Sequence, residues 1–335
     1  MWVSPSPCSP AGTAIAHEIG HSFQYQIYCD QILRGEIEES SYKSGFRYEY
    51  KGSTGGIGFW EQTAQGQAHE VYPSERFYDW HFDNWPINCH RHFEHENMRY
   101  ASYFLHVYWS EKRGNDVIAN IWNKSRYPDD AIQTYMKLYL SNDYDEMKNE
   151  LFDYAMKIAT YDLDELRIYS LEFLDKYETI FYENKGYYQI ANKQFPGNTG
   201  FNVIPLNLPK NDNKIKVEFV GLEPGSELAP DDPGEWILYD NVIGGKVNTY
   251  NNVNKGNIGW KYGFICLNSD DSRTYSKQFN SNNDIIDFDI KNNCKKLFMI
   301  VQGSPENYVQ QPWDNKEIND AQFPYKLKFT NTSIK

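Results

Sequence analysis

The sequence predicts a two-domain α+β protein, with a helix-rich domain over residues 1–182 and an all-β domain over residues 198–335. Three observations predict this division. Apolar residues recur at helical spacing from about residue 10 to 175. Beyond residue 200, short runs of β-type residues alternate with clusters of Asn, Gly, Asp and Ser. Between the two, residues 183–200 form a polar, turn-rich stretch that we interpret as a boundary.

The first predicted helix begins after Ser9-Pro10, an N-cap followed by proline at the first helical position, and ends at Gly35. Its apolar residues recur every four positions and form one stripe, made by Ile15, Ile19, Phe23 and Ile27. The side chains of His17, His21 and Gln24 fall on roughly the opposite side. The two imidazoles therefore do not belong to the apolar stripe.

His17 and His21 belong to the segment H-E-I-G-H. Two histidines at positions i and i+4 stand one above the other on a helix face, so both can bind one metal ion. Glu18 points to the side of this pair, where it can take a proton from a metal-activated water and pass it to a leaving amine. The alternative is a surface helix with two solvated histidines. The spacing favours a catalytic zinc site with Glu18 as the general base.

A catalytic zinc keeps three protein ligands and one open position, so a third ligand is needed. Residues 55–73 predict a second helix, which begins after a glycine-rich turn and ends before Pro73. One face of this helix carries small residues that permit close packing against the first helix, and it consists of Glu61, Ala64, Gln65 and Ala68. We expect Glu61 to be the third ligand. His69 and Glu70, near the helix end, are the alternatives.

Further helices are predicted near residues 97–112, 115–124, 128–141 and 143–160. In the second half the clearest strands are KIKVEFVGL, EWILYDNVI, IGWKYGFICL, DIIDFDI, KKLFMIVQG and PYKLKF. No helical periodicity intervenes between them. This pattern predicts a β-sandwich of jelly-roll or immunoglobulin-like kind.

An aromatic, histidine-rich connector covers residues 76–99. It offers a second metal site made by Cys89, His90, His92 and His95, but a loop over the mouth of an active site explains the same residues as well. One of its histidines, Tyr100 or Tyr103 is expected to donate a hydrogen bond to a tetrahedral oxyanion, and Tyr100 is our choice. The alternative for both tyrosines is packing against a neighbouring helix.

Other positions have two interpretations each. Gln24, one turn beyond His21, either orients that ligand or faces solvent. His106, in the apolar segment YFLHVYW, is expected to be a core histidine. The β domain offers a sugar-stacking platform of Trp236, Trp260 and Trp313, although aromatic residues of sandwiches are more often core or rim.

Composition argues against several classes of function. A formal net charge of −13 with no basic block makes nucleic acid and anionic membrane surfaces poor partners. No apolar run approaches the length of a membrane span, and no signal-peptide h-region stands at the start. The five cysteines show no C-x-x-C spacing and define no disulfide framework, although Cys266 and Cys294 could pair. Neither a phosphate-binding loop after a strand nor the G-x-S-x-G of a serine hydrolase occurs.

The segment H-E-I-G-H, followed by F-W-E-Q-T-A on a second helix, resembles the gluzincin zinc metallopeptidases, in which a glutamate from a downstream helix completes the metal site. The segments HEIGHSFQ, FWEQTAQ, GFNVIPLNLP and FPYKLKF are similar to a bacterial, Bacteroidetes-like family of unassigned function. The resemblance implies a zincin-like first domain and a secreted or cell-surface location. A zincin catalytic domain has a sheet upstream of its zinc helix, and we expect this chain to lack that sheet.

The function that we expect is that of a zinc-dependent metallopeptidase acting on extracellular proteins or glycoproteins. His17, His21 and Glu61 would bind Zn²⁺, Glu18 would act as the base and Tyr100 would stabilise the oxyanion. Two alternatives remain open. One is a non-catalytic, degenerate zincin that binds glycans or proteins at the cell surface. The other is an enzyme whose peptide hydrolysis depends on a sugar carried by a glycoprotein substrate such as a mucin.

Overall fold

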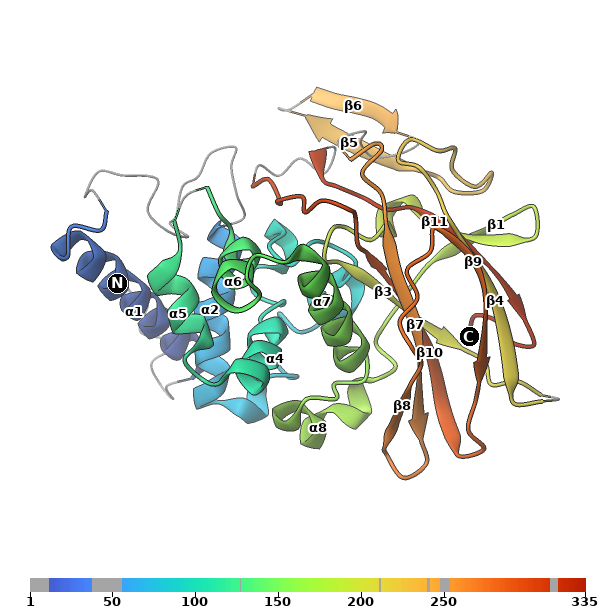
Figure 1. Cartoon of the computed structure of the whole chain (residues 1–335), viewed down its shortest axis with the longest axis horizontal. Helices are drawn as coiled ribbons and strands as arrows, with labels where there is room; N and C mark the ends of the chain where they lie inside the picture. The colour runs from blue at the N-terminus through green and yellow to red at the C-terminus, as the bar shows by residue number, and fades with distance from the viewer. Residues whose placement is uncertain are drawn as a thin grey trace.

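The computed structural model describes residues 12–37, 56–126, 128–210, 212–239, 242–247, 254–313 and 319–335, without the side chains of residues 56–57 and of the two strands between residues 235 and 247. Over these residues the chain is α+β: helices come first and antiparallel strands follow (Figure 1). The helices are α1 (Thr13–Leu33), α2 (Gly56–Val71), α3 (Asn84–Asn88), α4 (Phe104–Arg113), α5 (Val117–Lys124), α6 (Ala131–Tyr139), α7 (Tyr144–Ile158) and α8 (Asp164–Ser170). Short 3-10 turns lie at η1 (Pro73–Glu75), η2 (Glu96–Met98), η3 (Leu171–Phe173) and η4 (Asn192–Gln194). No helix in the described ranges is long and apolar enough to cross a membrane.

The strands are β1 (Phe181–Asn184), β2 (Tyr187–Ile190), β3 (Phe201–Leu206), β4 (Lys214–Gly221), β5 (Glu235–Tyr239), β6 (Val242–Val247), β7 (Trp260–Asn268), β8 (Arg273–Tyr275), β9 (Asn283–Asp289), β10 (Cys294–Gly303) and β11 (Tyr325–Thr330). Five of them form a sheet of order β1-β2-β11-β4-β9, and four form a sheet of order β3-β10-β7-β8. A separate hairpin pairs β5 with β6. Every strand pairing is antiparallel.

The four-stranded sheet lies between the helices and the five-stranded sheet. Ile265 and Ile300 belong to the apolar core shared with the helices, whereas Phe264 and Met299 belong to a second core shared with β4 and β11. Helix α7 packs directly on β7 and β10 (Figure 1). All nine residues of β7 are buried, which is why its sequence reads as a nearly continuous apolar run.

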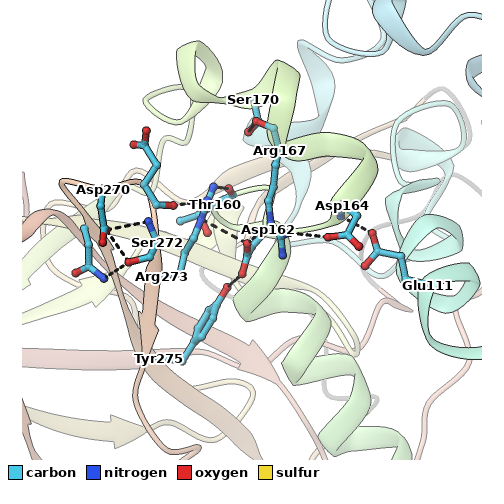
Figure 2. A network of polar contacts seen from close by, with 12 residues as sticks. Glu111, Thr160, Asp162, Asp164, Arg167, Ser170, Asp270, Ser272, Arg273 and Tyr275 are labelled. Atoms are coloured by element: carbon cyan, nitrogen blue, oxygen red, sulfur yellow. Dashed lines mark hydrogen bonds and ion pairs between the residues drawn. The ribbon is translucent and has the colours of Figure 1, made fainter.

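A network of polar contacts joins the end of α7 to the β7–β8 hairpin (Figure 2). The hydroxyl of Tyr275 donates to Asp162 Oδ2 at 2.5 Å, and Nε of Arg167 donates to Asp162 Oδ1 at 2.6 Å. Nη2 of Arg273 donates to the backbone carbonyl of Thr160 at 2.9 Å. Burial alone would raise the pKa of Asp162, but the bonds from Tyr275 and Arg167 outweigh it and lower that pKa. The helical part is therefore fixed against the sheet by charge-assisted bonds as well as by apolar contacts.

The cysteines are only partly predicted by the sequence. Cys266 on β7 and Cys294 on β10, two neighbouring strands, form a disulfide with a Cα–Cα distance of 5.6 Å. Cys29 is an exposed free thiol and Cys89 is a buried one. Burial raises the pKa of Cys89 to about 12, so this thiol is inert. Cys8 lies outside the described residues.

Helix α1 differs from expectation in the direction of its apolar stripe. Ile19 and Phe23 are 43% and 60% exposed, and the buried positions of the helix are Gly20, Gln24 and Gln31. The imidazole side, rather than the apolar stripe, packs against the protein. The predicted stop at Gly35 is confirmed by its positive φ of 68°, whereas Ser9 and Pro10 lie outside the described residues.

The segment interpreted as a boundary contains the hairpin of β1 and β2. Its turn residues Lys185 and Gly186 have φ of 54° and 80°, as a tight hairpin turn requires. Strand β2 pairs with β11, so the hairpin is an edge of the five-stranded sheet. The predicted helix at 97–112 is also shorter than expected, because η2 precedes α4.

Candidate metal centre

The centre is built where α1 and α2 come unusually close. A Cβ atom at Gly20 would lie 3.1 Å from Ala64 Cα and 2.6 Å from Gln67 Oε1, so only glycine permits this approach without a shift. Ala64 and Ala68 of α2 are fully buried. Gly20 lies between the two histidines of H-E-I-G-H, and the close approach therefore turns both imidazoles toward α2.

His17, His21 and Glu61 meet at one point. Glu61 Oε2 is 3.1 Å from His17 Nε2 and 3.3 Å from His21 Nε2. Their three ligand atoms lie within 4.8 Å of one another, and no other such group of His, Cys, Asp and Glu is found in the described part of the chain. Ligands held tetrahedrally at about 2.1 Å from a metal ion stand about 3.4 Å apart, which is close to both distances. These residues thus fit a small divalent metal ion.

Two buried amides determine which imidazole nitrogen faces this point. His17 Nδ1 lies 3.0 Å from Gln65 Oε1, and His21 Nδ1 lies 2.7 Å from Gln24 Oε1. Each amide is oriented by its own nitrogen, since Gln24 Nε2 donates to the carbonyl of Trp60 and Gln65 Nε2 donates to Asp79 Oδ2. Both oxygens must then accept a hydrogen bond from the Nδ1–H of the imidazole. In the metal-free site each Nε2 faces Glu61 and can donate to it when it is protonated. A metal that replaces these protons would find both Nε2 lone pairs directed at it.

The carboxylate of Glu61 gives the centre a negative charge that favours a cation. Burial alone would raise the pKa of Glu61, but the hydrogen bonds from His17 and His21 lower it to about 2. The same carboxylate raises the pKa of His21, although burial acts against this. Trp60 stacks on His21 with ring centroids 5.0 Å apart and restricts the orientation of the imidazole. Glu61 therefore carries its negative charge at neutral pH.

Behind the ligands lies a second group of polar side chains that the sequence analysis missed. Gln65 connects His17 to Asp79, whose Oδ2 is also 3.5 Å from His69 Nε2. Burial alone would raise the pKa of Asp79, but the hydrogen bonds from His69 and from the backbone N–H of His81 lower it to about 2. Gln65 stands one helical turn after Glu61, a spacing that could have predicted its role. Nothing in the sequence pointed to Asp79.

A cleft of about 820 Å³ opens beside the centre. One wall is α1, with His17 and the half-buried Glu18. The other wall is the segment from η1 to His81, together with Tyr100. Trp80 and Tyr78 lie on this wall and are 71% and 70% exposed. The connector therefore lines the cleft with aromatic residues, as one of its two sequence interpretations expected.

Tyr100 and His81 face the metal-binding residues from the far wall. Tyr100 lies beside His17 with ring centroids 5.8 Å apart, and beside His81 at 4.6 Å. Burial, and then the charge of Glu61, raise the pKa of Tyr100, so its hydroxyl stays protonated and can donate. Burial lowers the pKa of His81. The cleft thus has a carboxylate on one side and two neutral donors on the other.

Comparisons with known proteins place the chain in a family but not in a function. The sequence profile of a family of unknown function, DUF6055, matches residues 1–335. The chain belongs to the DUF6055 family. Among curated proteins, none matches the sequence.

In this DUF6055 chain the alternative ligands are engaged elsewhere. Glu70 pairs with Arg76 at 2.8 Å, and His69 is buried against Gln65 and Asp79. Gln24 orients His21, as one interpretation expected. Tyr103 is buried and stacks on His69, so it takes the packing role.

The second metal site, one of the two interpretations of the connector, is not assembled in the described residues. His92 contacts Tyr308, His95 lies near Asp320, and His90 is buried. Their ligand atoms do not form a metal-binding group with one another. His106 is a core histidine, and its ring centroid lies 4.9 Å from that of Phe59. Burial lowers the pKa of His106 to about 3.

The interpretation of Trp236, Trp260 and Trp313 as a sugar-stacking platform loses Trp260. Trp260 is buried, and its indole N–H donates to the carbonyl of Phe323 at 3.0 Å. The core interpretation therefore holds for this residue, because β7 is covered on both faces. Trp313 is half-buried, and the side chain of Trp236 lies outside the described residues.

Proposed function

We propose that this protein is a zinc-dependent metallopeptidase. The observation that carries the proposal is the convergence of His17, His21 and Glu61 beside a cleft whose wall also holds Glu18. A purely structural metal site has no need of a carboxylate that neighbours the ligands without contacting the metal. Two imidazoles and a carboxylate form the donor set typical of catalytic zinc, which keeps a fourth position for water or substrate.

The zinc ion, when bound by His17, His21 and Glu61, would polarise the scissile carbonyl and make the attacking water more acidic. The protein's own groups do the rest. Glu18 accepts the proton of the attacking water and delivers it to the leaving amine. From the opposite wall the hydroxyl of Tyr100 donates a hydrogen bond to the developing oxyanion, with His81 beside it. Gln24 and Gln65 hold the two imidazoles in orientation.

We interpret the helical part as a zincin-like catalytic domain and the two large sheets, which share one apolar core, as a β-sandwich. The disulfide between Cys266 and Cys294 supports a secreted or cell-surface location, because structural disulfides persist in oxidising compartments. Extracellular proteins or glycoproteins are the corresponding substrates.

The test is exchange of Glu18 for Gln in the zinc-loaded chain, with hydrolysis of casein and of a mucin-type glycoprotein as readouts. Turnover should fall by about 100-fold or more while the zinc content stays unchanged. Glu75→Gln is the matched control, because Glu75 lines the same cleft but is not assigned a catalytic role, and it should retain activity. Activity that survives in Glu18→Gln would remove Glu18 as the base. A wild-type chain that binds zinc but cleaves neither substrate would favour the non-catalytic binding protein.

A further inference from the structure

A second cleft, of about 600 Å³, lies at the junction of the helices and the sheets, away from the metal centre. Its lining comes from the first turns of α7, from the start of β7 and from the loops before β9 and after β10. These segments are far apart in the sequence and meet where α7 packs on the four-stranded sheet (Figure 1). The cleft is therefore a product of the whole fold.

Lys261 is the unusual residue of this cleft. Its side chain is only 7% exposed, yet it has no carboxylate partner among the described residues. Two of its ammonium protons are accounted for, by Asn149 Oδ1 at 2.7 Å and Gln278 Oε1 at 3.2 Å. Lysine is almost never buried without a counter-charge, because desolvation of the ammonium is costly. The third proton is left for a ligand, and the charge is countered only at a distance by the exposed carboxylate of Asp145.

A second lysine adds to the positive character of the cleft. Lys148 lines the same cleft as Lys261. Burial, and then repulsion by Lys148, lower the pKa of Lys261, while the charge of Asp145 acts in the opposite direction. Lys148 pairs with Asp145 at 2.6 Å, but the carboxylate of Asp145 is largely exposed and screened by water. Glu306, the other acid of the lining, is exposed as well. In a chain with net charge −13, two lysines that line one cleft favour an anion.

The rest of the lining is rich in amides and hydroxyls. Its side chains include those of Asn149, Asn280, Ser281, Asn282, Asn283 and Ser304. Amides offer a donor and an acceptor on one rigid group and so match the hydroxyls of a sugar. The apolar lining side chains are limited to Ile258 and the largely buried Trp260, so the cleft offers little surface to an apolar peptide.

We propose that this cleft binds a sugar unit bearing a carboxylate or sulfate, with Lys261 and Lys148 at the anion and the asparagines at the hydroxyls. The site is independent of the proposed peptidase activity. Its occupant differs from the neutral sugar expected of a tryptophan platform, because recognition rests on charge and amides rather than on stacking.

The experiment is calorimetric titration of the full chain with three ligands that share one core: 3′-sialyllactose, lactose 3′-sulfate and lactose. At low salt, at least one of the two anionic sugars should bind about tenfold or more tightly than lactose. A carboxylate-specific site would select the first, and a sulfate site the second. Lys261→Met should weaken binding about tenfold or more. Lys295→Met, an exposed lysine paired with Asp271 in the same half of the chain, should change nothing.

Asn282→Ala, in an exposed loop where a folding defect is not expected, provides a second variant and should weaken binding by about three- to tenfold. If Lys261→Met fails to fold, the affinity of Asn282→Ala for the anionic sugars tests the proposal in its place. Absence of binding by both anionic sugars, or equal binding of lactose, would overturn the proposal. So would unchanged affinity in the folded variants, or tighter binding of an acidic pentapeptide than of the sugars.

Discussion

Gln65 should control zinc affinity although it cannot contact the metal. It is 4% exposed, and its amide lies between His17 Nδ1 and Asp79 Oδ2 at 3.0 and 2.7 Å. Gln65→Leu has nearly the same volume but no hydrogen-bonding group. In this variant nothing fixes the tautomer of His17, and the imidazole can rotate or present a proton to the metal.

Two quantities should fall in Gln65→Leu for separate reasons: the affinity for zinc, and the free energy of unfolding of the metal-free chain. Removal of a partner that orients a metal-bound histidine costs about 10- to 100-fold in metal affinity, or about 1.4–2.7 kcal/mol. Independently, Asp79 loses its donor from Gln65 and keeps His69 and the backbone N–H of His81. A half-buried carboxylate that loses one donor costs about 1–3 kcal/mol in the free energy of unfolding of the metal-free chain.

The assay is competition for zinc against a chromophoric chelator, with urea unfolding in excess chelator to measure the metal-free chain separately. Gln62→Leu is the matched control, because Gln62 lies on the same helix and is fully buried, with its amide donating to the carbonyl of Phe93 at 2.6 Å. That variant should lose stability but change zinc affinity by less than about threefold. A zinc affinity in Gln65→Leu within about threefold of wild type would refute the reasoning.

Two further predictions concern the rest of the fold. Asp162→Asn should lower the free energy of unfolding by about 2–4 kcal/mol, because it weakens contacts to Tyr275, Arg167 and Arg273 together. In urea unfolding, Asp287→Asn, which alters only an exposed pair with Lys214, should cost less than about 1 kcal/mol, and an equal cost would contradict the prediction. Burial raises the pKa of both Asp130 and Glu94, so the folded state holds these protons more tightly than the unfolded state. Their contribution to the free energy of unfolding is then fully present below the pKa of an unfolded carboxyl group. It is lost as pH rises through the raised pKa of the folded state. Asp130→Asn should therefore reduce the loss of stability between pH 4 and pH 7 measured by urea unfolding; an unchanged pH dependence would show that Asp130 does not titrate as inferred.

The parts of the site that follow from local spacing could be predicted from the sequence. The i, i+4 relation of His17 and His21 is a property of one helix, and the downstream helix supplies Glu61 beside small residues that permit close packing. Because His17 and His21 must face Glu61, the side of α1 that packs against α2 follows from the same residues. Its apolar stripe was not a guide, because a glycine and buried amides, rather than aliphatic side chains, form the contact with α2.

The parts that depend on tertiary contacts could not be predicted. Asp79 reaches Gln65 only because the connector folds back over α2, and no spacing signals this. Trp260 could be rim or core until its strand was seen to be covered on both faces. Strands β1 and β2 have only four residues each and lie at one side of the five-stranded sheet, within a polar, turn-rich stretch that resembles a linker.

The central claim is that His17, His21 and Glu61 hold zinc, and metal content tests it most directly. Wild type, Glu61→Ala and Glu70→Ala would be dialysed and measured by plasma mass spectrometry, with circular dichroism to establish that each is folded. Glu70 is the control because it is a carboxylate of the same helix that pairs with Arg76 instead of the histidines. The account predicts about one zinc per chain in wild type and in Glu70→Ala, and its loss in Glu61→Ala. Folded wild type without zinc, or zinc retained in Glu61→Ala, would contradict it.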